Sequence, residues 1–136
     1  MKTLSLSATH NTPEIFFSTD ENKFMITGKS APEDVRGLYY PVVEWISAFI
    51  EEIKKNNPFN KDNPLVFRLD LDYFNSSSAK FLFDIFTTLR ELKLNGTPVI
   101  IEWHHDAEDT DLREAGEDMA MLSGLEFMFF PEERPM

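Results

Sequence analysis

Apolar and polar residues alternate with a period of two in the first thirty residues, which is the pattern of half-buried β-strands. The polar segment Thr19–Asn22 lies between two of these alternating segments and predicts a hairpin turn. Gly28–Glu33 follows and leads out of the predicted sheet. The predicted strands are Leu4–Thr9, Glu14–Ser18 and Lys23–Thr27.

Apolar residues then recur at helical spacing from Val35 to Lys55, so this segment is predicted to form a long amphipathic helix. Pro41 lies early in the segment, where proline is best tolerated, and predicts an irregular first turn or a later start. Asn56–Pro64 is rich in asparagine and proline and is predicted to be a loop. The buried stripe is predicted to comprise Val42, Val43, Ile46, Phe49, Ile50 and Ile53, with Tyr39, Tyr40 and Trp45 at the edge of the core.

The middle of the chain has the order strand, helix, strand. Leu65–Asp72 alternates, and a helix of about Ser77–Leu94 ends at the C-cap pair Asn95-Gly96. Pro98–His104 is largely apolar and is the next strand. This order predicts a parallel pair of strands joined by a right-handed crossover. The apolar character of Pro98–His104 also predicts that this strand is covered on both faces.

The last third of the chain predicts an acidic loop, a helix and a final strand. The loop is His105–Thr110, Gly124 ends the helix, and Leu125–Phe130 is the strand. The tail Pro131–Met136 is predicted to be frayed. The inner face of the helix is predicted to comprise Leu112, Ala115, Met119 and Leu122. Together the elements predict one α/β domain over residues 1–136, a mixed sheet with an N-terminal hairpin and helices packed on the sheet.

The composition limits the classes of function. The 136 residues carry 24 acidic and 13 basic side chains, a formal net charge of −11, and no cysteine. The lack of cysteine excludes disulfides and thiolate chemistry, and the lack of clustered lysine and arginine argues against binding to nucleic acid. No apolar run approaches the roughly 20 residues of a membrane span, and no leader opens the chain, so a cytoplasmic location away from membranes is expected.

The stretch Leu65–Lys80 changes from a strand to a helix within a short serine-rich turn. Asn75 and the serines after it, Ser76–Ser78, are residue types that cap helix N-termini. The turn leaves a serine hydroxyl beyond the carboxyl end of a strand, where ligands tend to bind in open α/β sheets. A phosphate there would meet free backbone N–H groups and the positive end of the helix dipole. A plain helix cap is the simplest interpretation.

The parallel strands place this turn beside the acidic loop, and the first compatible chemistry is that of a metal-dependent enzyme. Carboxylates suit Mg²⁺ or Ca²⁺, and histidines suit transition metals. The segment His104–Asp111, with Asp70 or Asp72, offers both kinds of ligand. The spacing matches neither an EF-hand loop nor a zinc-protease helix, so solvated surface charge is the favoured interpretation.

Two further chemistries involve the serine hydroxyls. Ser76 or Ser77 with His104 or His105 could form a hydrolytic triad, but the sequence contains no nucleophile-elbow motif. Alternatively, a serine on the turn could be a phosphoacceptor. Its phosphate would be repelled by nearby carboxylates and accepted by the helix N-terminus and Lys80, and either effect would alter a protein-binding surface.

Several segments taken together resemble the SiaC family of bacterial regulatory phosphoproteins. They span nearly the whole chain, in order and with compatible spacing. The matching segments are Thr12-Pro13, Gly28–Glu33, Tyr40-Pro41 with Glu44-Trp45, Tyr73–Lys80, and Trp103 with the acidic run through Glu114–Met119.

The resemblance implies a fold similar to the STAS domains of anti-sigma-factor antagonists, and a switch without catalysis or a cofactor of its own. In this family the unphosphorylated protein binds and activates a diguanylate cyclase, which promotes cyclic-di-GMP synthesis and biofilm formation. A Ser/Thr kinase with a histidine-kinase-like fold phosphorylates the protein and blocks this binding, and a PP2C-type phosphatase reverses the modification. The alternative is an anti-sigma-factor antagonist, which shares the fold and the switch but binds another partner.

The resemblance also assigns site residues. The family's acceptor is typically a threonine directly after a Phe-Asn pair, and Ser76 occupies that position, with Ser77 and Ser78 as alternatives. Lys80 and the helix N-terminus would receive the phosphate, and no metal ligand is assigned. The partner surface is expected to comprise Tyr73, Phe74, Asn75, Asp106 and Asp109. The family tends to have tyrosines after the tryptophan, where this chain has His104 and His105, and this departure bears on partner specificity.

Overall fold

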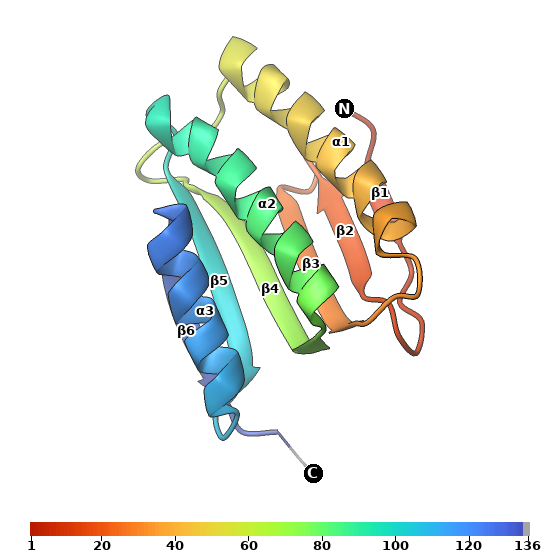
Figure 1. The fold of residues 1–136 in the computed structure, drawn as a ribbon. Helices are drawn as coiled ribbons and strands as arrows, with labels where there is room; N and C mark the ends of the chain where they lie inside the picture. Colours follow the sequence, from red (N-terminus) through yellow and green to blue (C-terminus); the bar gives the residue numbers. More distant parts are fainter. Residues whose placement is uncertain (135–136) are drawn as a thin grey trace.

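The computed structural model describes residues 1–134, which form a six-stranded sheet and three helices (Figure 1). The elements are β1 (Leu4–Leu6), β2 (Glu14–Ser18), β3 (Lys23–Ser30), α1 (Val35–Lys55), β4 (Leu65–Phe74), α2 (Ser76–Leu94), β5 (Val99–Asp106), α3 (Thr110–Ser123) and β6 (Glu126–Glu132). The strands lie side by side in chain order. β1, β2 and β3 pair antiparallel, whereas β3, β4, β5 and β6 pair parallel. The predicted α/β fold, a mixed sheet with an N-terminal hairpin and helices packed on it, is confirmed.

The core lies between the sheet and its three helices, which all cover the same face (Figure 1). Successive side chains of a strand point to opposite faces, so one half of β4 enters the core. Its buried half consists of Leu65, Phe67, Leu69 and Leu71. A fully buried apolar side chain of this size contributes about 1.5–3 kcal/mol to folding. The one-sided core therefore fixes which residues of each strand remain at the surface.

The prediction that the strand after α2 is covered on both faces is wrong. Burial alternates along β5, and no helix of residues 1–134 lies on the sheet face opposite α1, α2 and α3. We call this the uncovered face. Ile100, Glu102 and His104 point to it and are half-buried. The segment was predicted to be covered because Ile100 extends an apolar run, although its neighbours on the same face are polar.

β1 and β3 differ in length from the predicted strands. β1 ends at Leu6 rather than Thr9, because Thr9 closes a local turn in which its amide donates to the Thr12 carbonyl at 3.0 Å. β3 continues past Thr27 to Ser30, with an irregularity between Gly28 and Lys29 where Gly28 adopts a φ of +109°. The glycine therefore marks a bulge within the strand and not its end.

α1 has the predicted bounds, and its residues are helical from Val35 on, through Pro41. Its N-cap is Asp34, whose carboxylate accepts a hydrogen bond from the Gly37 amide at 3.0 Å. Tyr39 is completely buried, whereas Tyr40 is 52% exposed and lies outside the core edge to which it was assigned. Trp45 is half-buried and packs against the core.

The last third of the chain differs most from the prediction. Leu122 was assigned to the inner face of α3 but is 63% exposed, because the inward positions are Leu112, Gly116, Met119 and Ser123. The tail was predicted to be frayed, yet Pro131 and Glu132 belong to β6 and Arg134 forms ion pairs with the sheet. Pro135 and Met136 lie outside the described residues.

Candidate functional site

The turn between β4 and α2 is capped by Asn75 and leaves two serine hydroxyls exposed. The Asn75 side chain accepts a hydrogen bond from the Ser78 amide at 2.8 Å, and the Asn75 amide donates to the Ser30 carbonyl at 3.0 Å. Ser76 and Ser77 are the first two residues of α2, and both are exposed. Since Asn75 supplies the cap, neither of these hydroxyls is needed to satisfy the helix end.

Ser78 belongs to a buried chain of hydroxyl groups. The Ser30 hydroxyl donates to the Ser78 hydroxyl at 2.8 Å, and the Ser78 hydroxyl donates to the Ser30 carbonyl at 3.0 Å. Burial raises the pKa of the Tyr39 phenol against the opposing effect of its hydrogen bonds, so the phenol stays protonated and donates to the Ser30 hydroxyl at 2.7 Å. These contacts tie the serine turn to β3 and α1. They also place the Ser78 hydroxyl inside the protein and away from solvent.

Replacing Ser78 by alanine is expected to lower the free energy of unfolding by about 1–3 kcal/mol, because the buried Ser30 hydroxyl loses its acceptor. Urea unfolding monitored by tryptophan fluorescence measures this change. Ser77→Ala is the matched control, since an exposed serine in the same helical turn is expected to change stability by about 0.5 kcal/mol or less. Equal effects of the two substitutions would show that the buried hydroxyl chain does not stabilise the turn.

A phosphate on Ser76 would meet a positive environment on the helix side. The Ser78 amide is bonded to the Asn75 cap, which leaves the amides of Ser76 and Ser77 at the helix N-terminus, and the first turn contains no acidic residue. Lys80 is exposed and follows Ser76 by four residues, which places both on the same face of the helix. Lys29, on the neighbouring strand β3, lies beside Tyr73, with its ammonium 5.9 Å from the centre of the Tyr73 ring.

A groove of about 280 Å³ lies beside the turn, at the carboxyl end of β4 and the N-terminus of α3. Tyr73 is 52% exposed there. Asp109 also lines the groove, and its carboxylate caps α3 by accepting from the Leu112 amide at 2.9 Å. The lining residues are Asp72, Tyr73, Phe74, Asp109, Asp111, Leu112 and Ala115, so an apolar floor is rimmed by carboxylates. We call it the acidic groove.

Among the residues expected to form the partner surface, the structure brings Tyr73, Phe74 and Asp109 together at the acidic groove. Asp106 does not line the groove. Its carboxylate accepts from the Glu108 amide at 3.0 Å, within the turn that connects β5 to α3. Asn75 has the structural task of capping α2.

A second cluster of charged side chains lies on the uncovered face. His104 contacts Glu132 through Nδ1 at 2.5 Å and Glu102 through Nε2 at 3.3 Å, and its ring stacks on Phe130 with the centroids 4.7 Å apart. The Arg134 guanidinium pairs with Asp70 at 2.5 Å and also with Asp72. Glu132 and Arg134 were not among the predicted site residues, because the tail that carries them was expected to be frayed.

This cluster bears on the metal hypothesis. Asp70, His104 and Glu132 each offer a ligand atom, and these atoms lie within 4.8 Å of one another. The Arg134 guanidinium contacts Asp70 and lies 3.6 Å from Glu132, so an internal cation already supplies positive charge to these carboxylates. Asp106, Asp109 and the other acidic loop residues do not join this group.

Burial alone would raise the pKa of the Asp70 carboxyl, but the hydrogen bonds and charges of Arg134 and Arg68 outweigh burial and lower it. The carboxyl therefore has a lower pKa in the folded chain than in the unfolded chain. Such a group stabilises the fold above its unfolded pKa of about 3.9, and this stabilisation is lost as the pH falls through the folded pKa.

Arg134→Gln is expected to lower the free energy of unfolding by about 1 kcal/mol near neutral pH, because it removes the cation that pairs with Asp70. The difference from the unsubstituted chain should shrink as the pH falls below about 3.9 and Asp70 becomes protonated. Urea unfolding at several pH values measures both quantities, with the exposed Arg36→Gln as the control. A loss that is independent of pH would contradict the role assigned to the ion pair.

The structure does not assemble the hydrolytic triad considered from the sequence. His104 points to the uncovered face, whereas His105 is buried on the helix side with its Nδ1 2.9 Å from the Asp106 carbonyl. The Nε2 of His105 has no hydrogen-bond partner within residues 1–134. In this part of the chain neither histidine forms a hydrogen bond with Ser76 or Ser77.

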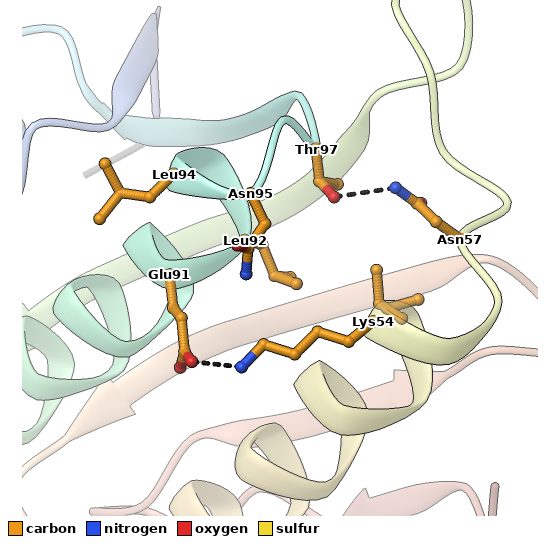
Figure 2. A pocket seen from close by; sticks show the side chains of 8 residues that line it. Lys54, Asn57, Glu91, Leu92, Leu94, Asn95 and Thr97 are labelled. Atoms are coloured by element: carbon orange, nitrogen blue, oxygen red, sulfur yellow. Dashed lines mark hydrogen bonds and ion pairs between the residues drawn. The ribbon is translucent and has the colours of Figure 1, made fainter.

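The most voluminous cavity described, about 680 Å³, lies at the other end of α2, between the C-termini of α1 and α2 (Figure 2). A 19-residue helix separates it from the serine turn by about 28 Å. Lys54 and Glu91 form an ion pair across the cavity, and Asn57 donates to Thr97 at 2.9 Å. These four polar side chains are engaged with one another, and the cavity lies far from the serine turn.

Comparison with known proteins places this geometry in a family. The sequence pattern of the SiaC family of regulatory phosphoproteins matches residues 6–132, nearly the whole chain. The chain belongs to the SiaC family. Proteins of this family are described as regulatory phosphoproteins. None of the helices formed by residues 1–134 is both long and apolar enough to cross a membrane.

Relatives in Pseudomonas aeruginosa agree in sequence and in structure. An uncharacterized protein of strain UCBPP-PA14, PA14_02130, is 30% identical over 118 residues, which is 87% of each chain. The crystal structure of P. aeruginosa apo-SiaC superposes with a TM-score of 0.79 at 28% identity and covers 96% of this chain and 99% of its own. SiaC bound to the diguanylate cyclase SiaD, whose activator it is, gives a TM-score of 0.81 at 27% identity, covering 95% of this chain and 99% of its own. The resemblance inferred from the sequence is confirmed.

Proposed function

We propose that this SiaC-family protein is a phosphorylation switch that activates a diguanylate cyclase while unphosphorylated and is turned off by phosphorylation of Ser76. The single observation that carries the proposal is an exposed serine at the first position of α2, beside the acidic groove, on a helix whose cap is supplied by Asn75. The relative that binds and activates a cyclase supports the choice of partner.

Ser76 is preferred over the other two serines for different reasons. Ser78 is completely buried, and its hydroxyl is engaged with Ser30. Ser77 is exposed as well, but Ser76 is the residue that directly follows the Phe74-Asn75 pair, the position that the family resemblance gives to the acceptor. A phosphate on Ser76 would have Lys80 and the helix N-terminus as partners.

Phosphorylation would weaken partner binding through charge and desolvation. A phosphoserine adds about −1.5 to −2 charges at neutral pH. A partner that contacts Tyr73 and the apolar residues of the acidic groove would have to remove water from the phosphate. Burying an unpaired charge is costly, so the partner would bind more weakly.

Other proteins would add and remove the phosphate. A Ser/Thr kinase with a histidine-kinase-like fold would add the phosphate, and a PP2C-type phosphatase with its own metal ions would remove it. The chain itself then needs no cofactor and no catalytic residue.

Cyclase activation tests the proposed function directly. The rate of cyclic-di-GMP formation from GTP is measured for purified P. aeruginosa SiaD, and for the cyclases of the protein's own organism, with and without this chain. We expect at least one cyclase to be stimulated by the unphosphorylated chain and not by the chain phosphorylated on Ser76. Stimulation that is equal for both forms, or absent for every cyclase, would refute the proposal.

A further inference from the structure

The uncovered face is unusual for a sheet of this kind. Four of the six strands, β3 to β6, are parallel, and parallel sheets are normally covered on both faces. Here the three helices of residues 1–134 all lie on the opposite face (Figure 1). Apolar side chains nevertheless point to the uncovered face from several strands, namely Phe16, Met25, Val66, Ile100, Met128 and Phe130.

The registers arrange the central strands of this face in matched rows. Between β4 and β5, Val66 lies beside Ile100, Arg68 beside Glu102, and Asp70 beside His104. Each row thus pairs an apolar residue with an apolar one, or a basic residue with an acidic one. In each pair, one residue lies on β4 and the other on β5, on opposite sides of a line that runs between the two strands.

The next strands outward continue this pattern. Met25 on β3 lies beside Arg68, and Met128 on β6 lies beside Glu102, so a methionine flanks the central charged pair on each side. One row away, Glu126 on β6 lies beside Ile100. On β3 the corresponding residue is Lys23, two positions before Met25. In these two rows, the two halves of the face therefore carry complementary groups at equal distances from the line between β4 and β5.

We propose that the uncovered face binds a second copy of this chain around a two-fold axis that runs along the strands between β4 and β5. Such an axis places β4 of one copy against β5 of the other, and β3 against β6. Arg68 then faces Glu102 of the second copy, Val66 faces its Ile100, and Met25 faces its Met128. Each of these contacts occurs twice in the dimer.

The charges favour the arrangement, and the area corresponds to a weak dimer. Arg68 has a half-exposed side chain, and the Glu102 side chain is 32% exposed, so both can reach across an interface. Four strands of each copy, β3 to β6, face one another, and at a spacing of about 4.8 Å they give a contact on the order of 800–1,000 Å² in total, the size of a weak interface. The net charge of −11 per chain opposes association at long range, and salt at physiological strength screens it beyond about 8 Å.

The symmetry also decides where the switch would lie in the dimer. Because the axis is parallel to the strands, both sheets run in the same direction. The two serine turns, at the carboxyl ends of the two β4 strands, would lie at the same end of the assembly. A dimer of this form would present two acidic grooves side by side to its partner.

Charge reversal across the proposed axis tests the arrangement, with mass measured by light scattering over a concentration series. Arg68→Glu and Glu102→Arg are each expected to weaken the dimer at least about tenfold, because each places like charges opposite one another twice. An equimolar mixture of the two variants should form a heterodimer, since the carboxylate introduced in one variant would then face the guanidinium introduced in the other. The double variant Arg68→Glu/Glu102→Arg should dimerise again.

Glu52→Arg, on the exposed side of α1, is the matched control and should dimerise like the unsubstituted chain. Thermal unfolding of each variant checks that the monomers are folded. An unsubstituted chain that stays monomeric into the high-micromolar range would overturn the proposal. If neither charge reversal weakened the dimer, the contact would lie elsewhere on the molecule and the proposal would be overturned. A mixture of the two reversed variants that did not form heterodimers would also overturn it.

Discussion

Replacing Ser76 by alanine is expected to yield a protein that binds the cyclase as well as the unmodified chain does and that the kinase no longer releases. The hydroxyl makes no hydrogen bond on which the fold depends, because Asn75 caps α2 and Ser78 is held by Ser30. Removing it should therefore change the stability by about 0.5 kcal/mol or less. Any change in the response of this variant to the kinase would therefore reflect the missing phosphate and not a loss of structure.

Ser76→Glu is expected to bind the cyclase at least about tenfold more weakly, which corresponds to about 1.4 kcal/mol. A carboxylate carries one charge where a phosphate carries almost two, so the substitution should reproduce only part of the effect of phosphorylation. Surface plasmon resonance with immobilised cyclase measures the affinity of both variants. Ser77→Glu is the control for a charge added one residue further along α2, and it should have a smaller effect. Equal affinities for Ser76→Ala and Ser76→Glu would contradict the account.

Gly116→Ala is expected to lower the free energy of unfolding by about 1–3 kcal/mol, although glycine-to-alanine changes inside helices normally stabilise by about 1 kcal/mol. A Cβ atom at this position would lie 2.6 Å from Trp103 Nε1, 2.7 Å from its Cε2 and 2.9 Å from Phe129 Cε1. These are atoms of rigid rings in the core, so α3 would have to move away from β5 and β6. The cost of this overpacking exceeds the gain in helix propensity.

The expected loss can be read from the melting temperature, which falls by about 3–5 °C for each kcal/mol in a chain of this length. Glu114→Ala is the matched control, because it introduces alanine at an exposed position of the same helix. The ring of Trp103 also packs edge-on against the ring of Phe74, next to the serine turn, with the two ring centroids 6.0 Å apart. A stabilised Gly116→Ala variant would show that α3 packs less closely on the sheet than described.

Much of the fold follows from periodicity along the chain. The alternation in Leu65–Asp72 and the apolar stripe in Val35–Lys55 predict β4 and α1 with nearly their observed bounds, because both segments bury one regular face in a large core. The serine turn is equally local. A strand that ends before Asn75 and a helix that begins after it place Ser76 at the helix N-terminus whatever the rest of the chain does.

The features that sequence reasoning missed depend on contacts between distant segments. Gly116, rather than a larger residue, faces inward in α3 because Trp103 occupies the space, so a stripe of large apolar residues pointed to Leu122 instead. The order of the tail rests on ion pairs between Arg134 and carboxylates more than sixty residues earlier. The apolar run that includes Ile100 suggested that both faces of β5 are covered, although Glu102 and His104 on the second face are polar.

The most direct test of the central claim is peptide mass spectrometry of the protein purified from its native cells. The account predicts a single phosphate, localised to Ser76, whose occupancy changes with growth conditions. The unphosphorylated fraction should be the one that copurifies with a cyclase. A phosphate on another residue, or no phosphate under any growth condition, would contradict the assignment of Ser76 as the switch.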